Sequence, residues 1–139
     1  MPRVPIYVEL NAFASSEYKD LLDFAAFMWD MRYNFPHADA LRFINESLSK
    51  GEAILLLDAL DETVMGKSVE EADISYKRIA NIIMDLATRY NNSYIVVTVR
   101  KASYNQRTRL EGFVELDVLD FRPEDIKRFI LQWFLIIHK

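Results

Sequence analysis

The sequence predicts an α/β domain with a mainly parallel sheet flanked by helices. Short runs of β-branched and other apolar residues alternate along the chain with longer segments of helical periodicity. The run Ala53–Asp58 is apolar at successive positions, as in a strand of a parallel sheet that helices cover on each side. The 139 residues suffice for one domain with a real core.

Four segments have the composition of strands. Val4–Leu10 is rich in β-branched and aromatic residues, and Pro5 is tolerated near the start of a strand. Ala53–Asp58 and Ser93–Val99 are apolar on both faces. Phe113–Leu119 alternates apolar and acidic residues, as a strand with one buried face does. We therefore expect four strands separated by helices.

The helices follow from spacing and end signals. They are predicted at Tyr18–Tyr33, at Ala38–Ser49, at about Val69–Tyr90 and in a C-terminal segment that begins near Pro123. Ser15 and Ser16 are candidate caps for the first helix, and Gly51 suits the end of the second. Proline is favoured in a first turn, which predicts the start of the last helix.

Composition excludes several classes of function. Seventeen basic and 21 acidic residues give a net charge of −4, which argues against a general nucleic-acid surface. The chain has no cysteine, so disulfides and thiolate metal sites are excluded. The start lacks the features of a signal peptide, and the apolar run Phe129–Ile137 is far shorter than the roughly 20 residues of a membrane span. We expect a cytoplasmic protein without a nucleic-acid or membrane partner.

Three acids follow the most apolar strand. Asp58 ends the run, Ala59 and Leu60 follow, and Asp61 and Glu62 are expected to project from the same edge. Ligands of open α/β sheets bind beyond the carboxyl ends of the strands, and Mg²⁺ takes one or two carboxylates together with phosphate oxygens. The cluster therefore predicts a magnesium site, although acids that merely terminate a strand are the alternative.

The next strand ends in a similar way. Thr98 and Arg100 are predicted to stand at the same edge of the sheet, one strand away from the acids. An arginine there can meet a terminal phosphate. Alternatively, Arg100 is a surface residue that pairs with Glu62 or Asp61.

These segments resemble the NACHT family of P-loop NTPases, a group of signal-transducing switch ATPases. "GEAILLLDALDE" resembles the Walker B signature of that family, and "LATRYNNSYIVVTVR" resembles its following helix and sensor strand. "VPIYVEL" is similar to the strand before Walker B, and "GFVELDVLDFRPEDIKRFILQWF" resembles the exit from the core into a helical extension. The resemblance covers the chain from about Val4 to Phe134.

The resemblance implies roles for five residues. Asp58 would bind Mg²⁺, while Asp61 and Glu62 would position or activate the attacking water. Arg100 would sense the γ-phosphate of ATP or GTP, with Thr98 in support. Phosphoryl transfer depends on such positioning and charge stabilisation. The expected cofactors are Mg²⁺ and ATP in a complete protein that couples nucleotide binding and hydrolysis to oligomerisation and signalling.

One family element is missing. A P-loop is a glycine-rich turn that ends in Gly-Lys-Ser/Thr. "MGKS" at 65–68 does not qualify, because Asp61 stands where the first glycine belongs and the motif follows the acidic strand. The chain thus reads as a fragment without Walker A, with residues 1–121 as part of the nucleotide-hydrolase core and 122–139 as the start of the helical extension. We expect the isolated chain to be inactive.

The missing P-loop strand has a further consequence. In the family, this strand lies between the sensor strand and the last strand, here Ser93–Val99 and Phe113–Leu119. We expect either that these two segments pair directly, or that the chain forms a homo-oligomer through the open edge or the C-terminal helix. The rival functions are a non-catalytic interaction domain and a Mg²⁺-dependent nuclease or phosphotransfer domain.

Overall fold

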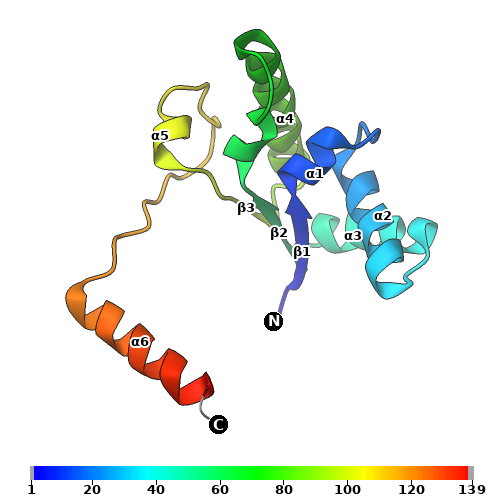
Figure 1. Ribbon diagram of the computed structural model, residues 1–139. Coiled ribbons are helices and arrows are strands. Elements are labelled where there is room, and N and C mark those ends of the chain that lie inside the picture. The colour runs from blue at the N-terminus through cyan, green and yellow to red at the C-terminus, as the bar shows by residue number, and fades with distance from the viewer. Residues whose placement is uncertain (1, 138–139) are drawn as a thin grey trace.

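The computed structural model describes residues 2–137 and shows a three-stranded parallel sheet flanked by helices, so the predicted α/β class is confirmed (Figure 1). In chain order the elements are β1 (Val4–Glu9), α1 (Leu10–Ser15), α2 (Leu21–Tyr33), α3 (His37–Ser49), β2 (Ala53–Asp58), the 3₁₀ helix η1 (Leu60–Val64), α4 (Val69–Arg89), β3 (Tyr94–Val97), α5 (Lys101–Tyr104) and α6 (Pro123–Ile137).

The sheet has the order β1-β2-β3, with β2 parallel to both neighbours. Ile6 of β1 lies beside Leu55 of β2, which lies beside Ile95 of β3. Partners in register point to the same face, and successive residues point to opposite faces. The aliphatic run of the sequence therefore forms the central strand and supplies side chains to both faces.

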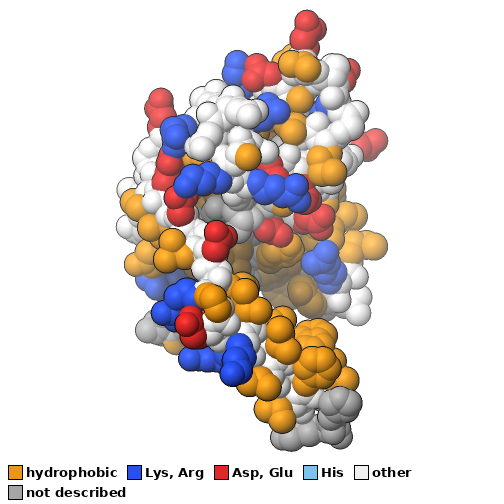
Figure 2. All heavy atoms as spheres, turned by 60° about the vertical axis from the view of Figure 1, so that its left-hand side comes forward, with side chains coloured by type: hydrophobic (Ala, Val, Ile, Leu, Met, Phe, Trp, Pro, Cys, Tyr) orange, Lys and Arg blue, Asp and Glu red, His pale blue; other side chains and the backbone are white. Residues whose placement is uncertain are grey.

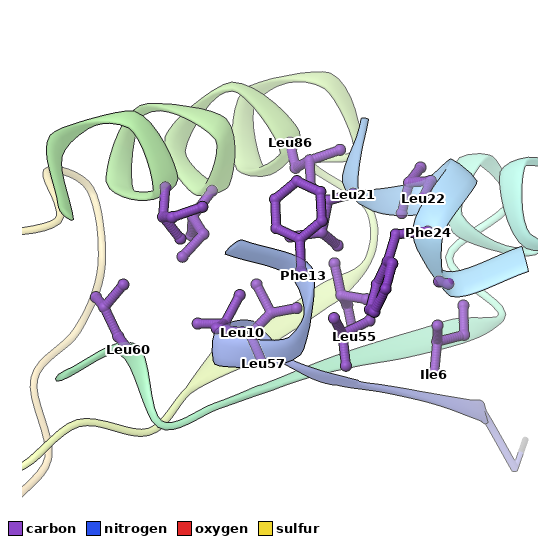
Figure 3. Close-up of a cluster of buried hydrophobic side chains, with 14 of the residues drawn as sticks. Ile6, Leu10, Phe13, Leu21, Leu22, Phe24, Leu55, Leu57, Leu60 and Leu86 are labelled. Atoms are coloured by element: carbon purple, nitrogen blue, oxygen red, sulfur yellow. The ribbon is translucent and has the colours of Figure 1, made fainter. Parts of the chain in front are cut away.

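Helices cover one face of the sheet and form the core with it. Ile6, Leu55 and Leu57 are at most 1% exposed on this face. Figure 3 shows them beneath Phe13 of α1 and Leu86 of α4, which are also buried. Burying such side chains contributes roughly 1.5–3 kcal/mol each, so this layer is the main source of stability.

The opposite face of the sheet is uncovered, contrary to the expectation of helices on each side. Tyr7 of β1, Tyr94 and Val96 of β3 are 45%, 57% and 44% exposed. Within residues 2–137 the helices that bury apolar surface pack on the other face or beside β1. An apolar strand shows that both faces tolerate burial, but it cannot show that a second layer exists.

At two helix ends the predicted capping residues can be compared with the structure. Gly51 ends α3 with φ +73°, and a Cβ atom there would lie 2.7 Å from the carbonyl oxygen of Asn92. Its predicted role is confirmed. The predicted serine caps are wrong: α2 begins at Leu21, and Asp20 caps it by accepting the N–H of Asp23 at 2.9 Å. Ser16 instead donates to the carbonyl of Phe13 at the end of α1.

The predicted strand Phe113–Leu119 does not form. This segment is extended, and Val114, Leu116 and Val118 are 85–99% exposed. β3 has a strand partner only on its β2 side among the described residues, so the expected direct pairing is also wrong. Alternation makes a segment compatible with a strand, but a strand also needs a neighbour within reach.

The last helix, α6, stands apart from the sheet and buries none of its residues (Figure 1). In Figure 2 its apolar side chains gather at one end of the molecule. In the part of the chain from residue 2 to residue 137, no helix combines the length and the apolar character needed to cross a membrane. The predicted self-association through α6 or the β3 edge stays a prediction.

Candidate functional site

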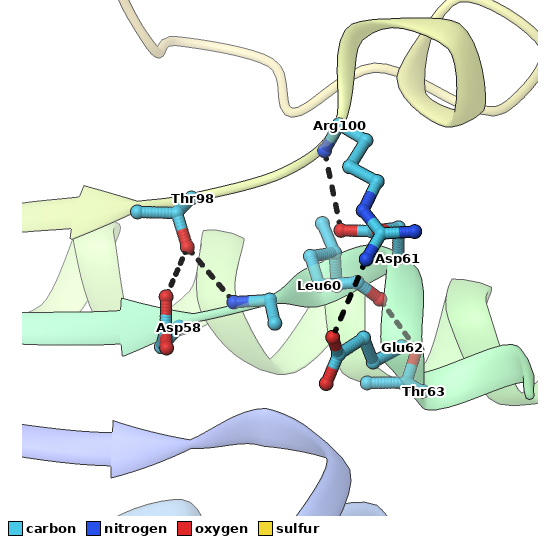
Figure 4. A network of polar contacts seen from close by, with 8 residues as sticks. Asp58, Leu60, Asp61, Glu62, Thr63, Thr98 and Arg100 are labelled. Atoms are coloured by element: carbon cyan, nitrogen blue, oxygen red, sulfur yellow. Dashed lines mark hydrogen bonds and ion pairs between the residues drawn. The ribbon is translucent and has the colours of Figure 1, made fainter.

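The site lies at the carboxyl edge of the sheet, where Asp58 ends β2. Its carboxylate accepts two hydrogen bonds, one from the Thr98 hydroxyl just after β3 and one from the Tyr7 hydroxyl of β1. The Tyr7 oxygen lies 2.9 Å from Oδ2. Figure 4 shows the Thr98 bond. The three strands of the sheet thus meet at one carboxylate.

These hydrogen bonds keep Asp58 ionised. The bond from Thr98, followed by the bond from Tyr7, lowers the pKa of the Asp58 carboxyl below its ordinary value. The same contact with Asp58 raises the pKa of the Tyr7 phenol. At neutral pH the site therefore presents a carboxylate between two neutral hydroxyl groups.

Thr98 also shapes the turn that follows β2. Its side-chain oxygen accepts the N–H of Ala59 at 2.8 Å, and its carbonyl accepts the N–H of Leu60 at 3.0 Å. Ala59 has φ +59°, in the left-handed region that non-glycine residues rarely adopt. The chain reverses there, which buries Leu60 completely and starts the 3₁₀ helix η1.

Asp61 and Glu62 are paired with Arg100. The backbone N–H of Arg100 lies 3.2 Å from Oδ1 of Asp61, and its Nε lies 3.4 Å from Oδ2 (Figure 4). Nη2 of Arg100 lies 3.8 Å from a Glu62 oxygen. Asp61 is 8% exposed, so it turns inward and does not project from the edge as expected. Pairing with the acids, the alternative considered for Arg100, is what the structure shows.

Of the three acids, Asp58 is the one that has no ion pair with Arg100 in residues 2–137. Residues 2–137 contain no group of three or more His, Cys, Asp or Glu side chains that could hold a metal ion together. Mg²⁺ needs only one or two protein carboxylates when phosphate and water supply the other oxygens. Asp58, flanked by the hydroxyl oxygens of Thr98 and Tyr7, is compatible with such binding, whereas Asp61 is occupied by Arg100.

The Gly-Lys-Ser sequence at 66–68 makes structural contacts around the start of α4. Lys67 donates to the Thr63 carbonyl at 2.9 Å and to the Ser75 hydroxyl at 2.7 Å. Ser68 caps α4 in a reciprocal capping box with Glu71. The side chains of Lys67 and Ser68 therefore make contacts within the fold, in agreement with the prediction that this motif is not a P-loop.

Sequence reasoning placed Asp58, Thr98 and Arg100 at one edge but missed Tyr7. The only available signal was that Tyr7 lies three residues before the predicted end of its strand, and the side of the sheet it faces depends on register. Comparisons with models of protein families, with curated proteins and with solved structures found no match.

Proposed function

We propose that this chain is part of a NACHT-type P-loop NTPase and carries the Walker B acid and the sensor residues of a nucleotide-dependent switch. In that proposal, residues 1–121 belong to the nucleotide-hydrolase core and 122–139 begin a helical extension. The complete protein couples ATP or GTP binding and hydrolysis to oligomerisation and signalling. The isolated chain is inactive, because it has no glycine-rich phosphate-binding turn.

One observation carries the proposal: an apolar central strand ends in Asp58, whose carboxylate accepts a hydrogen bond from Thr98 at the end of the neighbouring strand. A parallel sheet with polar groups at its carboxyl edge is the usual place for a nucleotide in α/β proteins. Within residues 2–137, β3 has a strand partner on one side only and segment 113–119 belongs to no strand, which adds support, since one inserted strand would pair with both.

The exposure and the contacts of each site residue suggest its role in the proposed function. Asp58 would hold Mg²⁺, which, when bound, neutralises charge on the phosphates. Thr98 and Tyr7 keep this carboxylate ionised and oriented. Glu62 is more exposed than Asp61 and is the better candidate for orienting a water molecule. Arg100 has 76% of its side chain exposed, so it can leave Glu62 for a phosphate while Asp61 holds its backbone.

A non-catalytic interaction domain is the second candidate. The observation in its favour is that Arg100 already has two acidic partners and that a whole face of the sheet is apolar and uncovered. In this alternative the fold is retained as a platform for another protein, and Arg100 stabilises the turn after β2. The nuclease alternative has no feature of the described residues in its favour.

The test uses the complete protein that contains this chain. Asp58→Ala should abolish Mg²⁺-dependent nucleotide binding, because it removes the carboxylate. Glu62→Gln should keep binding but slow hydrolysis, because the side chain keeps its shape and loses its charge. Asp73→Asn is the matched control: Asp73 is an exposed acid on α4 that pairs only with Lys77 among the described contacts, and both activities should be unchanged.

Two results would contradict the proposal. Equal loss of nucleotide binding in Asp58→Ala and Glu62→Gln would show that the assigned division of roles is wrong. Absence of nucleotide binding in the unaltered complete protein would favour the interaction domain. For the chain alone, calorimetry should show no micromolar affinity for Mg·ATP.

A further inference from the structure

The uncovered face of the sheet is a continuous apolar surface. Two residues from each strand form it, and we call it the open sheet face: Pro5 and Tyr7 of β1, Ile54 and Leu56 of β2, and Tyr94 and Val96 of β3. Pro5, Ile54 and Tyr94 are in register with one another, as are Tyr7, Leu56 and Val96. All six are at least partly exposed. Exposed apolar patches of this kind are typical of sites that bind another protein, a membrane or a ligand.

A groove beside β1 extends this surface. It has a volume of about 640 Å³ and is lined by Pro5 and Tyr7 together with Trp29, Phe35 and other residues of α2, the loop after it and α3. The open sheet face and the groove share two residues, so an element lying on the sheet would also reach the groove. Aromatic side chains such as Trp29 contribute most to contacts of this type.

The same chain carries an apolar element of matching size. On α6 the residues Ile126, Phe129, Ile130, Trp133 and Ile137 recur at helical spacing, and each is 45–58% exposed. This stripe is about 17 Å long at 1.5 Å per residue. A six-residue strand such as β1 spans roughly the same length. The stripe can therefore cover the open sheet face from end to end.

Two ion pairs lie at the start of the connection that leads to α6. Lys101 of α5 binds Asp117 at 2.6 Å, and Arg109 binds Glu115. They join the start of the connection to the α5 region, and residues 118–121 lead from there to Arg122, which pairs with Asp125 of α6. Figure 1 shows α6 well separated from the sheet, in a position that presents it to a second molecule.

The charges indicate the orientation. Asp58 and Glu9 lie at the carboxyl edge of the sheet, whereas Arg3 stacks on Tyr94 at 4.3 Å near the opposite edge. The amino end of a helix carries partial positive charge and its carboxyl end partial negative charge. A docked α6 is therefore favoured with its amino end near Asp58 and its carboxyl end near Arg3, antiparallel to the strands.

We propose that α6 of one copy docks antiparallel on the open sheet face and groove of a second copy, and that the exchange is reciprocal. Each copy then covers the apolar surface of the other. The proposal goes beyond the nucleotide-switch function and does not depend on it, although the open sheet face shares Tyr7 with the site and the docked helix would end near Asp58.

The first experiment measures mass by light scattering over a range of concentrations. The unaltered chain should be a dimer at micromolar concentration, and Trp133→Glu in the stripe should make it a monomer. Leu135→Glu is the matched control, because Leu135 lies on the opposite side of the same helix and is also exposed. It should remain a dimer. Circular dichroism should show that both variants keep their helices.

The second experiment tests the receptor surface. Val96→Arg on the open sheet face should also give a monomer, and an equal mixture with Trp133→Glu should associate, since the intact helix of one variant fits the intact face of the other. A dimer in Val96→Arg would overturn the proposal in favour of helix–helix contact. A dimer in Trp133→Glu would also overturn the proposal, in favour of pairing at the β3 edge.

Fluorescence distinguishes docking between copies from docking within one. The chain has two tryptophans, so Trp133→Phe leaves only Trp29, in the groove. Its emission should shift to shorter wavelength as the concentration rises, because α6 of a second copy then covers the groove. A blue-shifted emission that is independent of concentration, in a monomer, would show that α6 folds back on its own sheet and would overturn the proposal.

Discussion

The Tyr7 hydroxyl of β1 lies 2.9 Å from Oδ2 of Asp58 in β2, a diagonal contact between the two strands, since Tyr7 is in register with Leu56. The other oxygen of Asp58 is bound by Thr98 beyond β3. One carboxylate thus connects three strands that are far apart in the sequence. Its protonation state is set by two hydroxyl groups, which can be altered one at a time.

Thr98→Val should raise the pKa of Asp58, because the bond from Thr98 is the largest cause of its depression. A carboxyl whose folded pKa lies below its ordinary value stabilises the fold above that value, and this stabilisation is lost as the pH falls through the folded pKa. The variant should therefore lose less stability on acidification. Carbon-13 NMR titration of the Asp58 carboxyl measures the pKa directly.

Thr88→Val is the matched control for that experiment. The Thr88 hydroxyl donates to the Met84 carbonyl within α4 and does not contact Asp58. The titration of Asp58 should be the same in this variant as in the unaltered chain. An unchanged Asp58 pKa in Thr98→Val would mean that the hydroxyl contact is not kept in solution.

Tyr76→Phe should leave stability unchanged or raise it by about 1 kcal/mol. The Tyr76 hydroxyl is fully buried and has no hydrogen-bond partner among the described residues, and desolvation raises its pKa to about 12. A buried unsatisfied polar group costs about 1–3 kcal/mol, which phenylalanine avoids. Urea unfolding of the two proteins gives the difference.

Tyr104→Phe provides the comparison. Its hydroxyl accepts the N–H of Leu110 at 2.9 Å in a buried position, so removing it should cost about 1 kcal/mol or more. The changes in the free energy of unfolding caused by Tyr76→Phe and Tyr104→Phe should thus differ, with a loss only in Tyr104→Phe. A clear loss of stability in Tyr76→Phe would indicate a partner for this hydroxyl in solution.

Ala59→Gly should stabilise the chain. Ala59 adopts φ +59°, and the left-handed conformation costs a residue with a Cβ about 1–2 kcal/mol. Glycine avoids this cost but has more freedom in the unfolded chain, worth about 0.5–1 kcal/mol. The net gain should be about 0.5–1 kcal/mol in the free energy of unfolding. A net loss would show that the alanine methyl group has a packing role that outweighs the backbone strain.

The sequence was most informative where local pattern and burial coincide. Ala53–Asp58 was predicted with its observed bounds, because an aliphatic run followed by acids fits only a central strand and its end. The strand at 113–119 was predicted wrongly, since alternation does not reveal whether a neighbouring strand exists. α1 was missed because a six-residue helix has little periodicity, although Leu10 and Phe13 are fully buried.

The candidate site was predictable in its position but not in its contacts. The rule that strand ends share an edge brought Asp58, Thr98 and Arg100 together. The contact of Tyr7 with Asp58 depends on the register of two strands, and the inward turn of Asp61 depends on the left-handed Ala59. Both features arise from tertiary structure, which local sequence patterns do not encode.

Gly51→Ala should destabilise the chain far more than Gly66→Ala, although the two glycines have nearly the same conformation. Their φ angles are +73° and +74°, so alanine suffers the same backbone strain of about 1–2 kcal/mol at either position. At Gly51 the new Cβ would also lie 2.7 Å from the Asn92 carbonyl oxygen, whereas at Gly66 no atom lies within 4 Å. The end of α3 or the loop before β3 must therefore move in the first variant only. Overpacking of this kind costs about 1–3 kcal/mol more. Chemical unfolding of both variants measures the difference, and equal losses would show that the contact between Gly51 and Asn92 is not maintained in solution.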